Sequence, residues 1–172
     1  MLTVHDCETL SPCLITNARV ITADEIVLAT VELHADRFID VQPGVTSLAS
    51  ADDWDGDYLI PGLIELHTDN LEKQLEPRPG VRWPALPALL IHDALISSAG
   101  ITTVLDAMGV GDFDENSVRA QGLHAAARAL RHAREQDLLR AEHLLHMRCE
   151  LACENMLEVV TPFLDDPTVR LV

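Results

Sequence analysis

An apolar run that ends abruptly in metal-ligating side chains constrains this chain more than any other feature. Residues 58–66, YLIPGLIEL, are almost continuously apolar, which is typical of a strand covered on both faces. His67-Thr68-Asp69 follows directly. Alternate residues of a strand share a face, so His67 and Asp69 are predicted to point the same way from its C-terminal end. An imidazole beside a carboxylate suits zinc, manganese or iron, although such a pair also begins many ordinary loops.

Strand and helix patterns alternate after residue 58, which favours an α/β fold with a parallel sheet. In chain order, the predicted elements are strand 58–66, a helix from Pro87 to about Gly100, strand 101–107, helix 115–136, strand 144–151, helix 154–163 and a last strand at 168–172. By length alone, 172 residues would pass for one ordinary domain.

The N-terminal residues follow a different pattern. Period-two runs separated by Asn, Asp and Gly fill residues 14–41 and predict a small antiparallel unit. Residues 45–57 are small and acidic and are interpreted as a linker. We therefore predict two domains, with an N-terminal β-rich segment and linker at 1–57 and an α/β domain at 58–172.

The charge of the chain limits its partners. A formal net charge of −16 argues against nucleic acid and anionic membranes, which both require a basic surface. Lys73, Arg78 and Arg82 nevertheless lie within ten residues of one another, just after the predicted metal-ligand strand. Arginine can donate two parallel hydrogen bonds to the oxygens of one phosphate group, and lysine attracts these oxygens as a point charge. This cluster is therefore predicted to bind a phosphorylated substrate. The alternative is a solvated loop.

The cysteines indicate the compartment. The four cysteines include no C-x-x-C pair, and residues 1–12 do not resemble a signal peptide. No apolar run approaches the length of a membrane span. Free thiols in a reducing cytoplasm are the natural interpretation. Cys149 and Cys153 flank Glu150, but their spacing favours packing over metal binding.

Two long segments carry a resemblance to a known family. PGLIELHTDNLEKQLEPRPGVRWP and HDALISSAGITTVLDAMGVGD resemble the phosphonate-metabolism branch of the amidohydrolase superfamily, and the similarity extends from about Leu14 to Val172. The superfamily signature is PG-x-I/V-(D/E)-x-H-x-H, in which Asp69 takes the place of the second histidine. Gln74 stands where many relatives have a histidine. The resemblance implies a (β/α)8 barrel preceded by a small β-sandwich segment. A complete barrel of this kind needs about 250 residues, so residues 58–172 are expected to be its first half, cut inside its fourth strand.

The resemblance also implies an activity. Members of this branch are metal-dependent diphosphatases of the carbon–phosphorus lyase pathway. They hydrolyse α-D-ribose 1-methylphosphonate 5-triphosphate to the 5-phosphate and pyrophosphate. We therefore expect one or two divalent ions, zinc or manganese, bound by His67, Asp69 and Glu150, with Lys73, Arg78 and Arg82 on the substrate. The catalytic aspartate of the superfamily is expected beyond Val172, so the catalytic residue is unknown.

The predicted strand ends supply the remaining candidates, because the active site of such a barrel lies at the C-terminal ends of its strands. The only lysine is Lys73, so the later strands cannot supply the carboxylated lysine that often bridges two metals in the superfamily. Glu150 is expected in that place, unless it forms a salt bridge to Arg148 or Arg119. His146 and Arg148 share the face of Glu150 by period two.

The other polar candidates have less specific predictions. Asp106 is either an acid behind the metal ligands or a partner of a neighbouring helix. His92 is predicted to be a helix-packing or surface histidine and not a ligand, and His124, His132 and His143 are predicted to lie on helix surfaces or caps.

Two other functions remain open. One is a carbon–nitrogen hydrolase of the same superfamily, dihydroorotase-like or deacetylase-like. The other is an inactive fragment that acts only as an interaction module. Unpaired strand edges would leave the fragment unstable alone, so we expect a homo-oligomer or the remainder of its own barrel as a partner.

Overall fold

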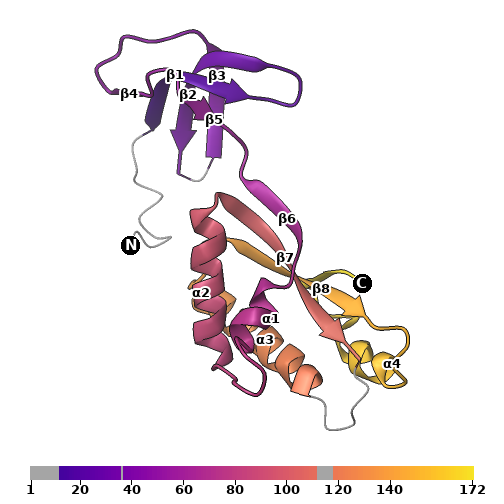
Figure 1. Cartoon of the computed structure of the whole chain (residues 1–172). Helices are drawn as coiled ribbons and strands as arrows, with labels where there is room; N and C mark the ends of the chain where they lie inside the picture. The colour runs from indigo at the N-terminus through magenta and orange to yellow at the C-terminus, as the bar shows by residue number, and fades with distance from the viewer. Residues whose placement is uncertain (1–11, 36, 112–117) are drawn as a thin grey trace. The chain divides into compact units, whose positions relative to one another are not determined.

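A computed structural model describes residues 12–35, 37–111 and 118–172 of the chain (Figure 1). The chain divides into two compact units, Met1–Pro61 and Gly62–Val172. The sequence predicted a division at 57/58. The observed division comes after Pro61 because residues 58 and 59 still pair with a strand of the first unit.

The first unit is a five-stranded sheet. Its strands are β1 (Cys13–Ile21), β2 (Ile26–His34), β3 (Arg37–Pro43), β4 (Ala51–Asp53) and β5 (Tyr58–Leu59). The order is β3-β2-β1-β4, and β5 also pairs with β1. β1, β2 and β3 are antiparallel as predicted, but β4 and β5 run parallel to β1. The predicted linker at 45–57 is therefore wrong in part, since β4 lies inside it and returns the chain to β1.

The second unit is a parallel sheet with helices. Its strands are β6 (Leu63–Thr68), β7 (Ile101–Val110), β8 (Glu142–Cys149) and β9 (Val169–Leu171), in the order β6-β7-β8-β9. All three pairings are parallel, as the alternating strand–helix pattern predicted. The connecting helices are α1 (Asn70–Leu75), α2 (Ala85–Ser98), α3 (Val118–Glu135), α4 (Met156–Val160) and the 3-10 helix η2 (Thr161–Phe163).

The main core lies between this sheet and its helices. Alternate residues of β8 are buried, and Leu145 and Met147 pack in one apolar cluster with residues of β7 and of the helices. The opposite face of β8 carries Leu144, His146 and Arg148, each only partly buried. β8 therefore presents His146 and Arg148 on the face that α2 and α3 do not cover.

Two helix predictions need correction. α2 begins at Ala85, with Pro84 at its N-cap, and not after Pro87. Proline is tolerated in the first turn because the N–H groups there have no partner within the helix, so Pro87 does not mark the boundary. The predicted end is close to the observed one, since α2 ends at Ser98 and Gly100 follows with φ +79°. The short helix α1 was not predicted.

The prediction of a buried strand at 58–66 is wrong. β6 begins only at Leu63, and Ile64 and Leu66 are 63% and 64% exposed. In the described part of the chain β6 pairs with β7 alone, so it is an edge strand. Full burial of an apolar strand requires cover on both faces, which the described residues do not supply.

Candidate active site

Two histidines from different strands meet on the polar face of the second unit's sheet. The Nδ1 atoms of His67, on β6, and His146, on β8, lie 3.2 Å apart. Their ring centroids are 4.9 Å apart and the rings are nearly perpendicular, at 75°. β7 lies between these strands, and Ala107 is the β7 residue paired with His146. The small Ala107 side chain leaves room for the two rings to touch across the strand.

Arg148 organises the carboxylates at the same strand ends. Its guanidinium forms an ion pair with Asp69, lies 3.4 Å from Glu72 Oε2 and places Nε 3.6 Å from Glu150 Oε1. The other oxygen of Glu72 accepts the Gly109 N–H at 2.6 Å, so this carboxylate also holds the end of β7. Three acidic side chains thus surround one cation. Glu72 was missed by the sequence analysis because the helix that carries it was not predicted.

The electrostatic surroundings favour a neutral imidazole at His146. Burial lowers the pKa of His146, and the neighbouring His67 lowers it further. A hydrogen bond with the Leu66 backbone acts in the opposite direction but does not compensate. A neutral ring keeps one lone pair, which can accept a hydrogen bond or bind a metal ion.

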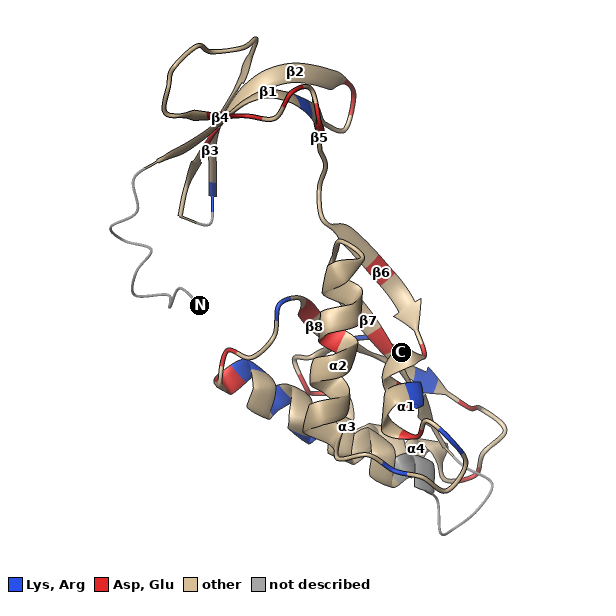
Figure 2. Ribbon diagram, turned by 60° about the vertical axis from the view of Figure 1, so that its left-hand side comes forward, with Lys and Arg blue, Asp and Glu red and all other residues tan. Residues whose placement is uncertain are grey.

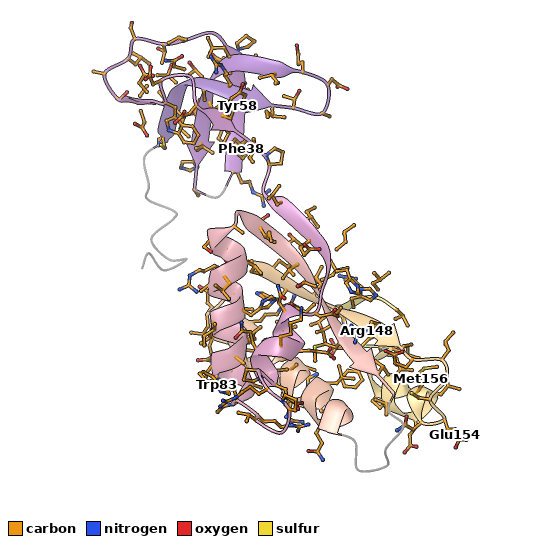
Figure 3. The ribbon with its side chains drawn as sticks, viewed as in Figure 1. Phe38, Tyr58, Trp83, Arg148, Glu154 and Met156 are labelled. Atoms are coloured by element: carbon orange, nitrogen blue, oxygen red, sulfur yellow. The ribbon has the colours of Figure 1, made fainter. Side chains whose placement is uncertain are left out.

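A cleft of about 800 Å³ opens beside these groups. Asp69, Glu72 and Arg148 line it, and Lys73 and Arg82 also contribute to its wall. The remaining lining residues are Leu75, Glu76, Pro79, Gly80, Trp83, Met108, Gln121, Gly122 and Ala125. Charges of both signs occur along α1 and the segment after it (Figure 2), and Arg148 and Trp83 are labelled in Figure 3.

The three predicted metal ligands lie in different parts of the second unit. His67 lies in β6, whereas Asp69 follows the strand and occupies the N-cap of α1, with φ −86° and ψ 7°. The prediction that both share a strand face is therefore wrong, yet Asp69 Oδ1 still lies 3.7 Å from His67 Nε2. Glu150 follows the last residue of β8, near Arg148. The roles of these three residues as metal ligands stay predictions.

The predicted phosphate-binding residues also separate. Lys73 and Arg82 line the cleft, and Arg82 lies 3.3 Å from Gln121 Oε1. Arg78 belongs to an exposed turn, in which its carbonyl accepts the Val81 N–H at 2.9 Å, and it is not among the residues that line this cleft. Their roles in substrate binding likewise stay predictions.

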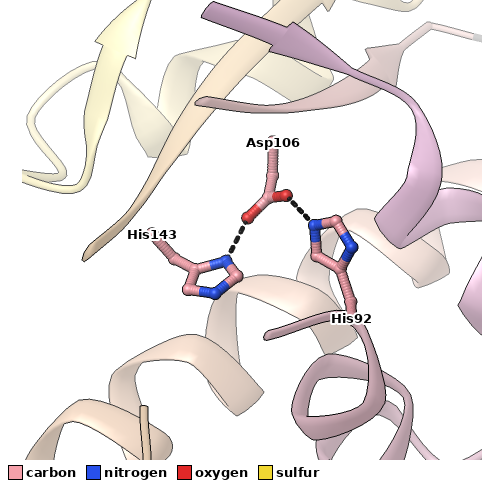
Figure 4. Close-up of side chains that lie close together, drawn as sticks. All are labelled: His92, Asp106 and His143. Atoms are coloured by element: carbon pink, nitrogen blue, oxygen red, sulfur yellow. Dashed lines mark hydrogen bonds and ion pairs between the residues drawn. The ribbon is translucent and has the colours of Figure 1, made fainter. Parts of the chain in front are cut away.

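A second polar cluster is buried between the sheet and α2. Asp106 of β7 lies between His92 of α2 and His143 of β8 (Figure 4), and each of its oxygens is 2.7 Å from one imidazole nitrogen. All three side chains are buried. Burial raises the pKa of Asp106, but the hydrogen bonds from His143 and His92 outweigh burial and lower it. Of the two predicted roles of Asp106, the structure favours pairing with a neighbouring helix.

This cluster continues to Asp93, the residue after His92. Asp93 accepts the backbone N–H groups of Arg140 and Ala141 at 2.9 and 3.0 Å, and the Arg140 guanidinium at 2.8 Å. Burial raises the pKa of Asp93, and these bonds lower it below the usual value. His143 Nε2 lies 3.5 Å from Asp93 Oδ1. The network ties α2 to the start of β8.

The position of His143 was predicted wrongly, as a helix surface or cap. His143 lies in β8 and is fully buried. The sequence contained a signal, since His143, Leu145 and Met147 alternate and all face the core. The predicted strand began at residue 144, one position too late to include it.

His92, Asp106 and His143 form a group that could hold a metal ion, since one ligand atom from each lies within 4.8 Å of the others. The contacts within the group favour hydrogen bonding. Two ligands of a tetrahedral zinc ion are roughly 3.3 Å apart, given metal–nitrogen distances near 2.0–2.1 Å. The 2.7 Å separations here are those of charge-assisted hydrogen bonds.

Comparison with known proteins gives one clear sequence relative. The chain is 38% identical over 159 residues to α-D-ribose 1-methylphosphonate 5-triphosphate diphosphatase of Escherichia coli. The aligned region covers 92% of this chain and 42% of that protein. The chain thus spans less than half the length of this relative. No family model matches the chain. No helix in the described ranges is both long and apolar enough to cross a membrane.

Solved structures support the fold. N-isopropylammelide isopropylaminohydrolase of Burkholderia multivorans matches with a TM-score of 0.55 and 18% identity, covering 89% of this chain and 42% of that chain. A D-hydantoinase matches with a TM-score of 0.55 and 17% identity, covering 91% of this chain and 31% of that chain. N-acetyl-D-glucosamine-6-phosphate deacetylase of Mycobacterium smegmatis matches with a TM-score of 0.51 and 18% identity, covering 80% of this chain and 32% of that chain.

This chain matches only part of each of these proteins. The predicted fold class, an incomplete (β/α) barrel preceded by a β-rich segment, is confirmed. Sequence and fold together also confirm the predicted resemblance: the chain is similar to the N-terminal part of an amidohydrolase-superfamily enzyme, on the branch of the ribose 1-methylphosphonate 5-triphosphate diphosphatases.

Proposed function

We propose that this chain supplies part of the active site of a metal-dependent hydrolase that releases pyrophosphate from α-D-ribose 1-methylphosphonate 5-triphosphate. The observation that carries the proposal is the position of Lys73 and Arg82 in one cleft with Asp69 and Arg148. In a chain with a net charge of −16, cations gathered beside possible metal ligands suit an anionic substrate. The similarity to the Escherichia coli diphosphatase supports the same choice.

The donor atoms at the strand ends fit a divalent ion. His67 Nε2 and Asp69 Oδ1 are 3.7 Å apart, close to the roughly 3.3 Å that separates two ligands of a tetrahedral zinc ion. Nitrogen and carboxylate ligands suit zinc or manganese. Glu150 lies near the same guanidinium that holds Asp69, so it is the third ligand in this proposal. A bound ion would polarise a phosphoryl oxygen and lower the pKa of a bound water.

The residues of the chain would act mainly by binding and charge neutralisation. Hydrolysis joins a water oxygen to phosphorus and breaks the bond to the bridging oxygen, which leaves with pyrophosphate. Phosphoryl transfer gains most of its rate from positioning and electrostatic stabilisation. Lys73 and Arg82 would hold the leaving pyrophosphate from the cleft wall. Arg78 would act only from the rim, since it lies in an exposed turn.

The test uses the full protein that carries this chain. Glu150→Ala and His67→Ala should each lower the bound divalent metal per protein, measured by elemental analysis, and abolish pyrophosphate release. Lys73→Ala should keep the metal and weaken binding of the triphosphate substrate. Wild-type metal content in both His67→Ala and Glu150→Ala would disprove this ligand set.

A carbon–nitrogen hydrolase is the alternative function. The deacetylase-like and dihydroorotase-like enzymes would share His67 and the strand that carries it, so metal binding does not separate the two functions. Substrate binding separates the two functions. Inorganic triphosphate should inhibit the wild-type protein and inhibit Lys73→Ala much less. Hydrolysis of an amide or cyclic ureide without sensitivity to triphosphate would favour the alternative.

A further inference from the structure

The two ring nitrogens of His67 have different neighbours. Asp69 Oδ1 lies 3.7 Å from Nε2, whereas His146 Nδ1 lies 3.2 Å from Nδ1. The two sides of the ring therefore have different surroundings. An ion shared with Asp69 can use only Nε2, and Nδ1 is left to His146.

The contact with His146 depends on the residue between the two strands. β6 and β8 both pair with β7, and Ala107 of β7 is the partner of His146 in the ladder. Paired residues of neighbouring strands point to the same face of the sheet. Ala107 is fully buried, and a single methyl group at this position allows His67 and His146 to meet above it. A larger side chain there would separate the rings.

The chemistry of imidazole decides how the two rings share a proton. A neutral imidazole has one N–H and one lone pair, so of two ring nitrogens 3.2 Å apart one must donate and the other accept. A histidine that offers the lone pair of Nε2 to an ion carries its proton on Nδ1. His67 is then the donor, and His146 accepts through the lone pair of its own Nδ1.

We propose that His146 is the positioning residue of His67: it accepts the His67 Nδ1–H and thereby keeps Nε2 turned toward Asp69. Histidines that bind metals commonly donate their second N–H to a fixed acceptor, which sets the tautomer and the orientation of the ring. Carboxylates and carbonyls usually take this place, and here a second imidazole takes it. The inference rests on the proposed function, in which His67 is a metal ligand.

The first experiment reads the tautomer of His67 directly in the metal-free protein. Long-range proton–nitrogen NMR spectra of the ring distinguish the Nδ1–H form from the Nε2–H form, and the His67→Ala variant identifies the signals. We expect the Nδ1–H form in the wild type and in His146→Asn, whose amide oxygen stands near the original Nδ1. In His146→Leu the acceptor is gone, and the Nε2–H form, which free imidazole side chains prefer, should appear.

The second experiment measures cobalt(II) affinity from the visible absorption of the bound ion. His146→Leu should bind cobalt about 10- to 100-fold more weakly, as for other residues that orient metal ligands. His146→Asn should restore most of the affinity. His132→Leu makes the same exchange at an exposed position of α3 and should bind like the wild type.

The outcomes separate the two hypotheses. Equal loss of affinity in His146→Asn and His146→Leu would overturn the acceptor role, and so would an unchanged Nδ1–H tautomer in His146→Leu. Unchanged cobalt affinity in His67→Ala would instead overturn the proposed function. Loss of affinity in His67→Ala with none in His146→Leu would overturn the positioning role alone.

Discussion

Replacement of Asp106 tests how much the buried histidine–aspartate cluster stabilises the second unit. Asp106→Ala leaves the imidazole N–H groups of His92 and His143 without their acceptor in a fully buried site. Each buried donor without an acceptor costs about 1–3 kcal/mol. Breaking a buried ionic contact by removing one partner costs about 3–5 kcal/mol. We therefore expect Asp106→Ala to lower the free energy of unfolding by about 3–5 kcal/mol.

Asp106→Asn separates the loss of charge from the loss of hydrogen bonds. The amide keeps one acceptor oxygen, and its NH2 group can donate to a histidine that changes tautomer. The expected cost is about 1–2 kcal/mol, the difference between charged and neutral hydrogen bonds. Asp165→Ala, at an exposed position, should change stability by no more than about 0.5 kcal/mol.

The assay is urea unfolding followed by circular dichroism. All described helices lie in Gly62–Val172, so the helical signal reports on this unit. The two-state fit gives the free energy of unfolding and its dependence on urea. A loss below about 1 kcal/mol for Asp106→Ala would refute the reasoning, because both imidazoles would then have found other acceptors.

Three further predictions follow from the same unit. The pKa values of Asp93 and Asp106 lie below 3.8 in the folded state. The stability that these carboxylates contribute is therefore present above pH 3.8 and is lost as the pH falls through their folded pKa values. Urea unfolding at a series of pH values should show a smaller loss of stability at acid pH in Asp106→Asn than in the wild type. Gly111→Ala should destabilise by about 1–3 kcal/mol in thermal melts, because φ is +97° and the new Cβ would lie 2.9 Å from the Cys153 Cβ. Leu71→Ala should cost about 2–5 kcal/mol by the same urea assay, since Leu71 is buried in the main core.

The parts of the fold that local sequence determines were predictable. The segment Ile101–Ala107 is β-branched and apolar, and it forms most of β7. The parallel order of the sheet followed from strand–helix alternation. Burial was less predictable, because an apolar sequence shows that a strand can be buried but does not show which other elements cover it. Ile64 and Leu66 show this difference.

The candidate site divides in the same way. His67 and Glu150 were found through motif and strand position, and both lie at or just beyond strand ends. The contacts that define the geometry cross between strands: His146 reaches His67, and Arg148 reaches Asp69. Such contacts depend on side-chain size at the intervening strand and on register, which a single sequence does not specify.

The order of the strands in the second unit also bears on how the chain folds during synthesis. Each strand from β7 to β9 pairs with the one before it in the chain, so the ladder can extend in the order in which the ribosome delivers its residues. No described strand of this sheet has to wait for a distant segment to be inserted between it and its predecessor. Pairing between sequence neighbours shortens the loops that must close and favours rapid, N-to-C folding.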